Sequence, residues 1–311
     1  MKGFPKLSNL KKNYLLLSFS FLVILLLILL FLSVYLRVRI IEDTVFPSSF
    51  AVSSGFKFPI LKTEFIPDIS AQGAVIMDAD SKTVLYSKNP ELRFSPASTT
   101  KIMTALTALE YFKTTDILTV KTATDDGSIL GLKKGEKMTF QNMLYAMLLP
   151  SANDAALAIS QNYPGGEKAF VAKMNDNAKK FNLYNTHYED PAGLMDDGDY
   201  TTPVDLARLA SIAIKNPEFA KVVSTKEKVI SDISGANVYD IQNLNELLGV
   251  DGIDGVKTGY TEEAGQVLVT SKLENGHTII MVVMLSQDRF ADTEKLLNLV
   301  SGNITYLPIH P

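Results

Sequence analysis

An uncharged, almost wholly apolar run near the N-terminus constrains this chain more than any other feature. It covers residues 14–36 and includes the unbroken aliphatic stretch Val23–Leu30. As a helix with a rise of ~1.5 Å per residue, the run reaches about 34 Å, whereas the hydrocarbon core of a bilayer is ~30 Å thick. We therefore expect a membrane-spanning helix over residues 14–36.

The residues that flank this run predict its orientation. Four lysines precede it, and Arg37 and Arg39 follow it. Because positive residues stay on the cytoplasmic side, we expect the N-terminus inside and the bulk of the chain outside. A cleaved signal peptide is the alternative, with an apolar core of about 7–15 residues that closes at small residues. This run is longer and ends at Val34–Arg37, which favours an uncleaved anchor.

The composition excludes several functional classes. The chain contains no cysteine, which excludes a disulfide framework and a cysteine nucleophile. Its formal net charge is only −4 over 311 residues, so no nucleic-acid partner is implied. The histidines His187, His277 and His310 are scattered without metal-ligand spacing. We therefore expect no metal and no cofactor.

Turn residues and hydrophobic patterns divide the rest of the chain. We expect a cytoplasmic tail at 1–13, a linker at 37–69, a folded domain at 70–302 and a short tail at 303–311. Two β-prone runs, 74–77 and 83–86, predict a hairpin, and Thr202 with Pro203 predicts a helix start. The remaining patterns predict helices at 98–112, 139–149, 167–181 and 291–300, and strands at 116–120, 266–270 and 278–285.

Ser98 and Lys101 open the first of these helices. Residues i and i+3 of a helix lie on one face, about 5–6 Å apart. A lysine whose pKa is lowered by burial or by a neighbouring cation can take the proton of a serine hydroxyl and make it a nucleophile. The structural alternative is that Ser98 caps the helix and Lys101 is solvated.

Two further polar motifs follow. Ser151 and Asn153 come directly after a helix break at Pro150, where both side chains can turn into a cleft. Alternatively, Ser151 and Asp154 form a capping box. The segment Lys257–Gly259 lies in a glycine-bounded β-prone run, which suits a strand that another group approaches closely. An ordinary turn and strand start is the alternative there.

The order of these motifs resembles the set found in class A β-lactamases and penicillin-binding proteins. From about Ala71 to Leu299 the chain resembles the D-alanyl-D-alanine carboxypeptidases, the low-molecular-mass penicillin-binding proteins. Other matching stretches are Pro96–Lys101, Asp190–Leu194, Lys257–Thr261 and Arg289–Ala291. The resemblance implies an α+β fold of the serine β-lactamase and DD-peptidase type: an antiparallel sheet flanked by helices, with a mainly helical second lobe.

The resemblance also implies roles for individual residues. Ser98 would attack the carbonyl between the last two D-alanines of a peptidoglycan stem peptide, and Lys101 would accept its proton. Ser151 and Asn153 would relay protons and position substrate. The backbone N–H groups of Ser98 and Tyr260 would form the oxyanion hole. The implied substrate-binding residues are Lys257 and Thr258, which would hold the terminal carboxylate, together with Gly259 and Tyr260.

The partners implied are a pentapeptide ending in D-Ala-D-Ala and, as inhibitors, β-lactam antibiotics. The location implied is the bacterial cell membrane, crossed once, with the catalytic domain outside the cytoplasm. Members of this family often carry a C-terminal β-domain and a C-terminal amphipathic anchor. Here only residues 301–311 follow the last predicted helix, so the N-terminal helix is expected to provide the tether.

Three other functions are alternatives to the carboxypeptidase. A D,D-endopeptidase would use the same residues. A class A β-lactamase needs Glu-x-x-Leu-Asn between the second and third motifs, whereas the string Glu294–Asn298 lies after Lys257. A non-catalytic wall-binding protein would be expected to lack Ser98, Lys101 or Lys257, and all three are present. The carboxypeptidase is therefore the preferred function.

Overall fold

The computed structural model describes residues 18–36 and 57–308 of a chain that divides into two compact units. The first unit contains the helix Ser18–Leu36, which has 19 residues and a mean hydropathy of 3.0. This helix is long and apolar enough to cross a membrane, and it lies within the run predicted to do so. Residues 14–17 of that prediction lie outside the described residues. The second unit runs from Lys57 to Ile309.

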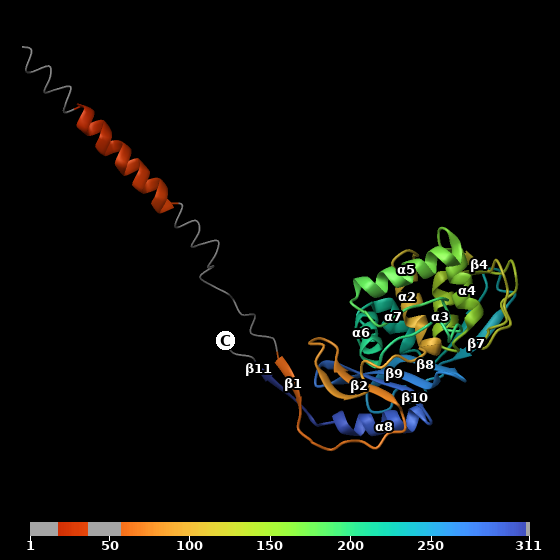
Figure 1. The fold of residues 1–311 in the computed structure, drawn as a ribbon. Coiled ribbons are helices and arrows are strands. Elements are labelled where there is room, and N and C mark those ends of the chain that lie inside the picture. Colours follow the sequence, from red (N-terminus) through yellow and green to blue (C-terminus); the bar gives the residue numbers. More distant parts are fainter. Residues whose placement is uncertain (1–17, 37–56, 309–311) are drawn as a thin grey trace, which may run out of the picture. The chain divides into compact units, whose positions relative to one another are not determined.

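A five-stranded antiparallel sheet lies at the centre of the second unit (Figure 1). The predicted hairpin is present as its first two strands, and the predicted antiparallel sheet is confirmed. In spatial order the strands are β3 (Val84–Lys88), β2 (Gly73–Asp78), β10 (His277–Ser286), β9 (Gly265–Glu274) and β8 (Ile253–Thr261).

Strand β10 has buried side chains on both faces of this sheet. Successive side chains of a strand point to opposite faces. Accordingly, Ile279, Met281 and Val283 join one buried cluster, and the residues between them join the other. The C-terminal helix α8 (Arg289–Val300) contributes to the first cluster and lies on one side of the sheet (Figure 1). A continuous apolar run is therefore needed in β10, since neither face meets water.

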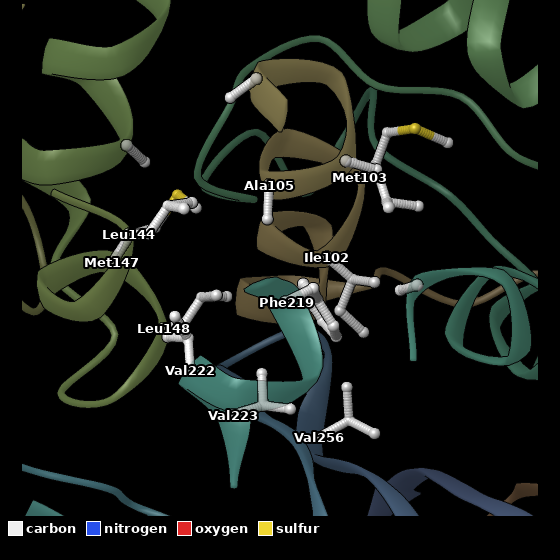
Figure 2. Close-up of a cluster of buried hydrophobic side chains, with 14 of the residues drawn as sticks. Ile102, Met103, Ala105, Leu144, Met147, Leu148, Phe219, Val222, Val223 and Val256 are labelled. Atoms are coloured by element: carbon white, nitrogen blue, oxygen red, sulfur yellow. The ribbon is translucent and has the colours of Figure 1, made fainter. Parts of the chain in front are cut away.

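The second cluster joins the sheet to a mainly helical lobe on its other side. Figure 2 shows side chains from several helices of this lobe, among them Ile102, Leu148 and Phe219, near Val256 of strand β8. Helix α6 begins as predicted, because Pro203 opens it and the Thr202 hydroxyl accepts the Asp205 N–H. The helices of the lobe are α2 (Lys101–Leu109), α3 (Phe140–Leu148), α4 (Asn153–Asn162), α5 (Gly166–Lys180), α6 (Pro203–Ala213) and α7 (Pro217–Val223).

Two small ribbons complete the lobe. The predicted strand near residue 118 is β4 (Ile117–Thr119), which pairs with β5 (Lys137–Thr139). Strands β6 (Glu227–Ser231) and β7 (Val238–Gln242) form a second ribbon that the sequence did not predict. Each of their strands is five residues or shorter, and so short a pattern carries little periodic signal.

The predicted linker and tail contain a strand pair, so the absence of structure expected there was wrong. Strand β1 (Lys57–Leu61) pairs antiparallel with β11 (Ile304–Pro308). The two strands lie at opposite ends of the second unit, and neither has a sequence neighbour that completes it. A pairing over this separation leaves no local signal, because each strand depends on a partner that only the folded unit supplies.

Candidate active site

A single turn of 3₁₀-helix holds Ser98, and the α-helix behind it begins at Lys101. The turn, η1 (Ala97–Thr100), is followed directly by α2. Lys101 Nζ lies 2.8 Å from Ser98 Oγ, so the two predicted residues are hydrogen-bonded. Ser98 is partly exposed, whereas Lys101 is fully buried. The alternative is therefore wrong at both positions: Pro96 occupies the N-cap position of η1 and Thr100 that of α2, and Lys101 is not solvated.

Two more oxygen atoms complete the surroundings of the Lys101 amine. Nζ donates to Asn153 Oδ1 at 2.7 Å and to the Ala192 carbonyl at 2.9 Å. A charged ammonium group has three protons to donate, and these three acceptors match it. A neutral amine keeps two protons and a lone pair, so one neighbour must then turn its own proton toward the nitrogen. The Ser98 hydroxyl is the neighbour that carries such a proton.

Burial brings the pKa of this amine close to neutral pH. Removal from water disfavours the charged form and lowers the pKa of Lys101 to about 7, although the charges of Asp190 and Asp154 oppose the change. An amine with this pKa exists in both protonation states near neutral pH. It can therefore take a proton from Ser98 and return it later in the reaction.

The start of α4 places Asn153 against the amine. The Asn153 side chain donates to the Asp126 carbonyl at 2.8 Å, and its backbone N–H donates to the Ser128 carbonyl at 2.7 Å. The next residue, Asp154, accepts backbone N–H groups of residues 130, 131 and 132. These contacts fasten the loop over residues 126–132 to α4. The orientation of the Asn153 amide is thus determined by both of its ends.

Ser151 lies just before α4 in a left-handed conformation, with φ of 65°. Its side chain is buried, and within the described part of the chain no hydrogen-bond partner reaches its Oγ. Ala152, rather than Ser151, occupies the N-cap position, so the capping box considered for Ser151 and Asp154 is not formed. A buried hydroxyl without a partner is costly, which makes a functional role for Ser151 the better interpretation.

Strand β8 brings the third motif beside Ser98. A Cβ added to Gly259 would lie 3.2 Å from both the Ala97 Cβ and the Ser98 backbone nitrogen. The strand and the turn therefore touch at the level of their backbones, the close approach that the sequence predicted for this glycine-bounded run. Thr258 is buried and Tyr260 is 55% exposed, so the strand leaves the protein interior near its C-terminal end.

Lys257 places a second buried amine on this strand. Its Nζ donates to the Thr258 carbonyl at 2.9 Å. Burial, together with the positive charges of Lys101 and Arg289, lowers the pKa of Lys257 well below its usual value. An arriving carboxylate would reverse this effect, because an opposite charge stabilises the ammonium form.

Arg289 is a residue of the site that the sequence analysis left without a role. It is the first residue of α8, and its guanidinium donates to the Gly259 carbonyl at 3.0 Å. The motif Arg289–Ala291 belonged to the resemblance, but nothing in its own pattern indicated that α8 reaches β8. Arg289 therefore places a guanidinium group beside β8, at the end of the site where Lys257 lies.

The loop from Asp190 to Met195 closes the site from a third direction. Its Gly193 has φ of 79°, and a Cβ there would lie 2.0 Å from the Ala97 carbonyl oxygen. A side chain at this position would displace the residue that precedes Ser98. The loop also supplies the Ala192 carbonyl that Lys101 contacts, and the sequence had assigned no function to that atom.

Comparison with known proteins places this geometry in a family. The model of the family described as D-alanyl-D-alanine carboxypeptidase matches residues 61–288. The chain is 33% identical to D-alanyl-D-alanine carboxypeptidase DacF of Bacillus subtilis over 88% of this chain and 72% of that protein. It is 35% identical to the D-alanyl-D-alanine carboxypeptidase of Streptomyces sp. strain K15 over 75% of this chain and 87% of that protein.

One relative is named for a different activity, and one solved structure for a third. A D-alanyl-D-alanine endopeptidase of Pseudomonas aeruginosa is 32% identical over 78% of this chain and 81% of its own length. The crystal structure of the Streptomyces K15 DD-transpeptidase superimposes with a TM-score of 0.72 and 34% identity, over 76% of this chain and 98% of that one. The fold expected from the resemblance is therefore confirmed.

Proposed function

The chain belongs to the D-alanyl-D-alanine carboxypeptidase family of serine peptidases, and we propose that it removes the terminal D-alanine of peptidoglycan stem peptides by way of Ser98. The observation that carries this proposal is the contact between Ser98 Oγ and Lys101 Nζ, 2.8 Å long, with the amine fully buried. A nucleophile and a base within hydrogen-bond reach are what acyl transfer requires.

In the proposed first step, the neutral amine of Lys101 takes the Ser98 proton while Oγ bonds to the carbonyl carbon between the two D-alanines. The C–N bond then breaks, and the departing D-alanine amine receives that proton. The product is an ester between Ser98 and the shortened peptide. In the second step water attacks the ester carbonyl carbon and Lys101 takes a proton from it. The bond to Ser98 Oγ then breaks, Lys101 returns that proton to Oγ, and the shortened peptide leaves as a carboxylic acid.

The backbone around Ser98 supports stabilisation of the oxyanion. We assign the oxyanion hole to the N–H groups of Ser98 and Tyr260, as the resemblance implied. Support comes from the close approach of Gly259 to the Ser98 nitrogen, which brings the two backbone segments together. Donors fixed in this way need little reorganisation when charge develops, and such donors usually contribute a large part of the rate.

The positive end of the site favours a substrate with a free carboxylate. Lys257 and Thr258 would bind that carboxylate. Arg289, whose guanidinium donates to the Gly259 carbonyl, would add a positive charge nearby. Asn153 would position the peptide, and Ser151, whose buried hydroxyl lacks a partner among the described residues, would relay a proton. A β-lactam carries a carboxylate and a reactive amide carbonyl, so it would acylate Ser98 in the same pose.

A comparison of substrates tests this proposal against the endopeptidase alternative. Full-length protein in detergent would be given a peptide ending in D-Ala-D-Ala, the same peptide with a C-terminal amide, and a cross-linked peptide dimer. We expect kcat/KM for the free acid to exceed that for the amide by at least about 10²-fold, because Lys257 loses its anionic partner with the amide. Free D-alanine would be quantified by chromatography.

Each other result of that comparison has a definite meaning. Cleavage of the dimer at a rate above that of the acid would make the chain an endopeptidase. Penicillin labelling without cleavage of any of the three peptides would refute the proposed substrate but retain the serine acyl-enzyme. Absence of both from a folded sample would refute the catalytic proposal.

We further propose that the helix Ser18–Leu36 is an uncleaved anchor within residues 14–36, with the N-terminus in the cytoplasm and the catalytic unit outside. The expected result is that the protein stays in the membrane pellet after carbonate extraction and retains Met1 or Lys2 as its first residue. Release into the supernatant with a new N-terminus beyond residue 36 would identify a cleaved signal instead.

A further inference from the structure

The two N–H groups assigned to the oxyanion hole lie on segments that are distant in the chain. Ser98 belongs to η1 and Tyr260 to β8, and the segments meet where a Cβ added to Gly259 would lie 3.2 Å from the Ser98 nitrogen. Among the described residues, no hydrogen bond runs directly from residues 95–100 to β8. Van der Waals contact keeps the two segments from coming closer but resists their separation only weakly.

One carboxylate oxygen joins these two segments. Asp196 Oδ1 accepts the Ser95 hydroxyl at 2.5 Å and the Thr261 hydroxyl at 2.9 Å. Ser95 lies three residues before Ser98, and Thr261 directly follows Tyr260 as the last residue of β8. Hydrogen bonds to a carboxylate are shorter and stronger than those between neutral groups. The Asp196 side chain therefore bridges the entry to η1 and the end of β8.

The backbone on both sides of Asp196 is held in place. The Met195 carbonyl accepts the N–H groups of residues 198 and 199, at 2.9 and 2.8 Å, which closes a turn around Asp196. Beyond this turn, Thr201 and Phe94 exchange two backbone hydrogen bonds of 2.9 and 2.8 Å. The loop thus returns beside the residue that precedes Ser95, and the carboxylate is already placed for both of its hydroxyl partners.

We propose that Asp196 is a positioning residue of the reaction proposed above: by holding the hydroxyls of Ser95 and Thr261 on one oxygen atom, it fixes the spacing of the oxyanion donors. This inference rests on the proposed function. Oxyanion donors are effective when both lie about 2.7–3.1 Å from the place where the charge develops. Misplacement by about 1 Å can lower a rate by about 10²-fold. Asp196 acts through the two hydroxyls and not by contact with the reacting atoms.

The negative charge of this region offers a different role for Asp196. Asp196, Asp197 and Glu263 line the same two adjoining pockets, and such a wall could attract a positively charged group of a substrate. The two roles need different properties of the side chain, because positioning requires an acceptor oxygen and attraction requires a charge. D196N keeps the acceptor without the charge, whereas D196A removes both.

The first experiment measures acylation by a fluorescent penicillin over a range of concentrations, with full-length protein in detergent. It gives a limiting rate and a half-saturating concentration. We expect D196A to lower the limiting rate by about 10- to 100-fold and to change the half-saturating concentration by less than about threefold. The rate is the more sensitive quantity because the oxyanion donors matter most when charge develops.

Two further variants make this result specific. D196N should recover most of the lost rate, since Oδ1 of the asparagine can still accept both hydroxyls. D197A is the matched control, because Asp197 is the next residue of the loop and is exposed, and it should match the wild type. A D196N variant as slow as D196A would overturn the proposal in favour of the charge. An unchanged limiting rate in D196A, with or without weaker binding, would also overturn it.

Substitution of Thr261 tests the bridge from its other end. T261V removes the hydroxyl and keeps the branched shape, whereas T261S keeps the hydroxyl and should acylate at nearly the wild-type rate. The Thr261 oxygen also accepts the Ala264 N–H at 3.1 Å, so T261V alone changes more than one contact. The double variant D196A/T261V isolates the shared contact. We expect its loss of rate to be clearly smaller than the product of the two single losses, and a loss equal to that product would overturn the proposal.

Thermal unfolding of the same four proteins measures the bridge without any activity. D196A and T261V should each lower the melting temperature by a few degrees, and the double variant should lose less than the sum. Such coupling without acylation even in the wild type would refute the serine acyl-enzyme and leave the bridge supported. Normal acylation of the wild type, with losses of rate and of melting temperature that are both independent, would refute the bridge and leave the proposed function intact.

Discussion

Ser98→Ala is expected to abolish both the release of D-alanine and covalent labelling by a fluorescent penicillin, with a loss of about 10³-fold or more. The reason is that the Ser98 Oγ is the atom that forms the acyl bond, and alanine offers no substitute. Ser98 is partly exposed and its hydroxyl contacts Lys101 rather than the core, so removal of one oxygen should leave the fold intact. Labelling gels and D-alanine quantification on the same samples measure both losses.

The matched control for this variant is Ser87→Ala. Ser87 is an exposed serine on β3, a strand at the opposite edge of the sheet from β8, and its loss should change neither readout. Penicillin labelling that persists in Ser98→Ala would identify another nucleophile. Labelling lost with peptide cleavage intact would show that the two reactions use different residues.

Lys101→Met is the second substitution with a large expected effect, a fall in the acylation rate of about 10²- to 10⁴-fold. Methionine fills a buried space similar to that of the lysine stem but cannot accept a proton. In the wild type the rate should rise with pH through about 7, because the neutral form of Lys101 is the reactive one and its fraction grows as the proton is lost. This rise should be missing in Lys101→Met.

Lys101→Arg distinguishes a base from a positive charge. Arginine keeps the charge and several donors for Ser98, Asn153 and Ala192, but it does not lose its proton in proteins. We therefore expect it to be as defective as methionine. If Lys101→Arg acylates at a rate near that of the wild type, then Lys101 acts through its charge and another group takes the Ser98 proton.

Much of this site could be predicted from the chain because its signals are local. The spacing of Ser98 and Lys101 dictates that the two side chains meet on one helical face, whatever the rest of the fold does. Thr202 and Pro203 mark a helix start by chemistry confined to a few residues. The apolar run at 14–36 likewise predicts a membrane-spanning helix from its own length and composition, without contacts to other parts of the chain.

Other expectations failed where the decisive contact comes from elsewhere in the chain. Ser151 looked equally suited to cap a helix, and only the structure shows that Ala152 takes that place. The segment Lys57–Leu61 looked like linker until Ile304–Pro308 paired with it. In each case the residue types permit two arrangements, and the choice depends on neighbours that are distant in sequence.

By itself, then, the sequence determined which residues carry the chemistry and how Ser98 stands relative to Lys101. The tertiary structure alone decided that Lys101 is buried, because its burial comes from α4, the loop that begins at Asp190 and the surrounding lobe. It also decided that Arg289 reaches β8 and that the Ala192 carbonyl lies against the Lys101 amine. The physical reason is that a pKa and a charge environment are properties of the folded surroundings, and no spacing along the chain contains them.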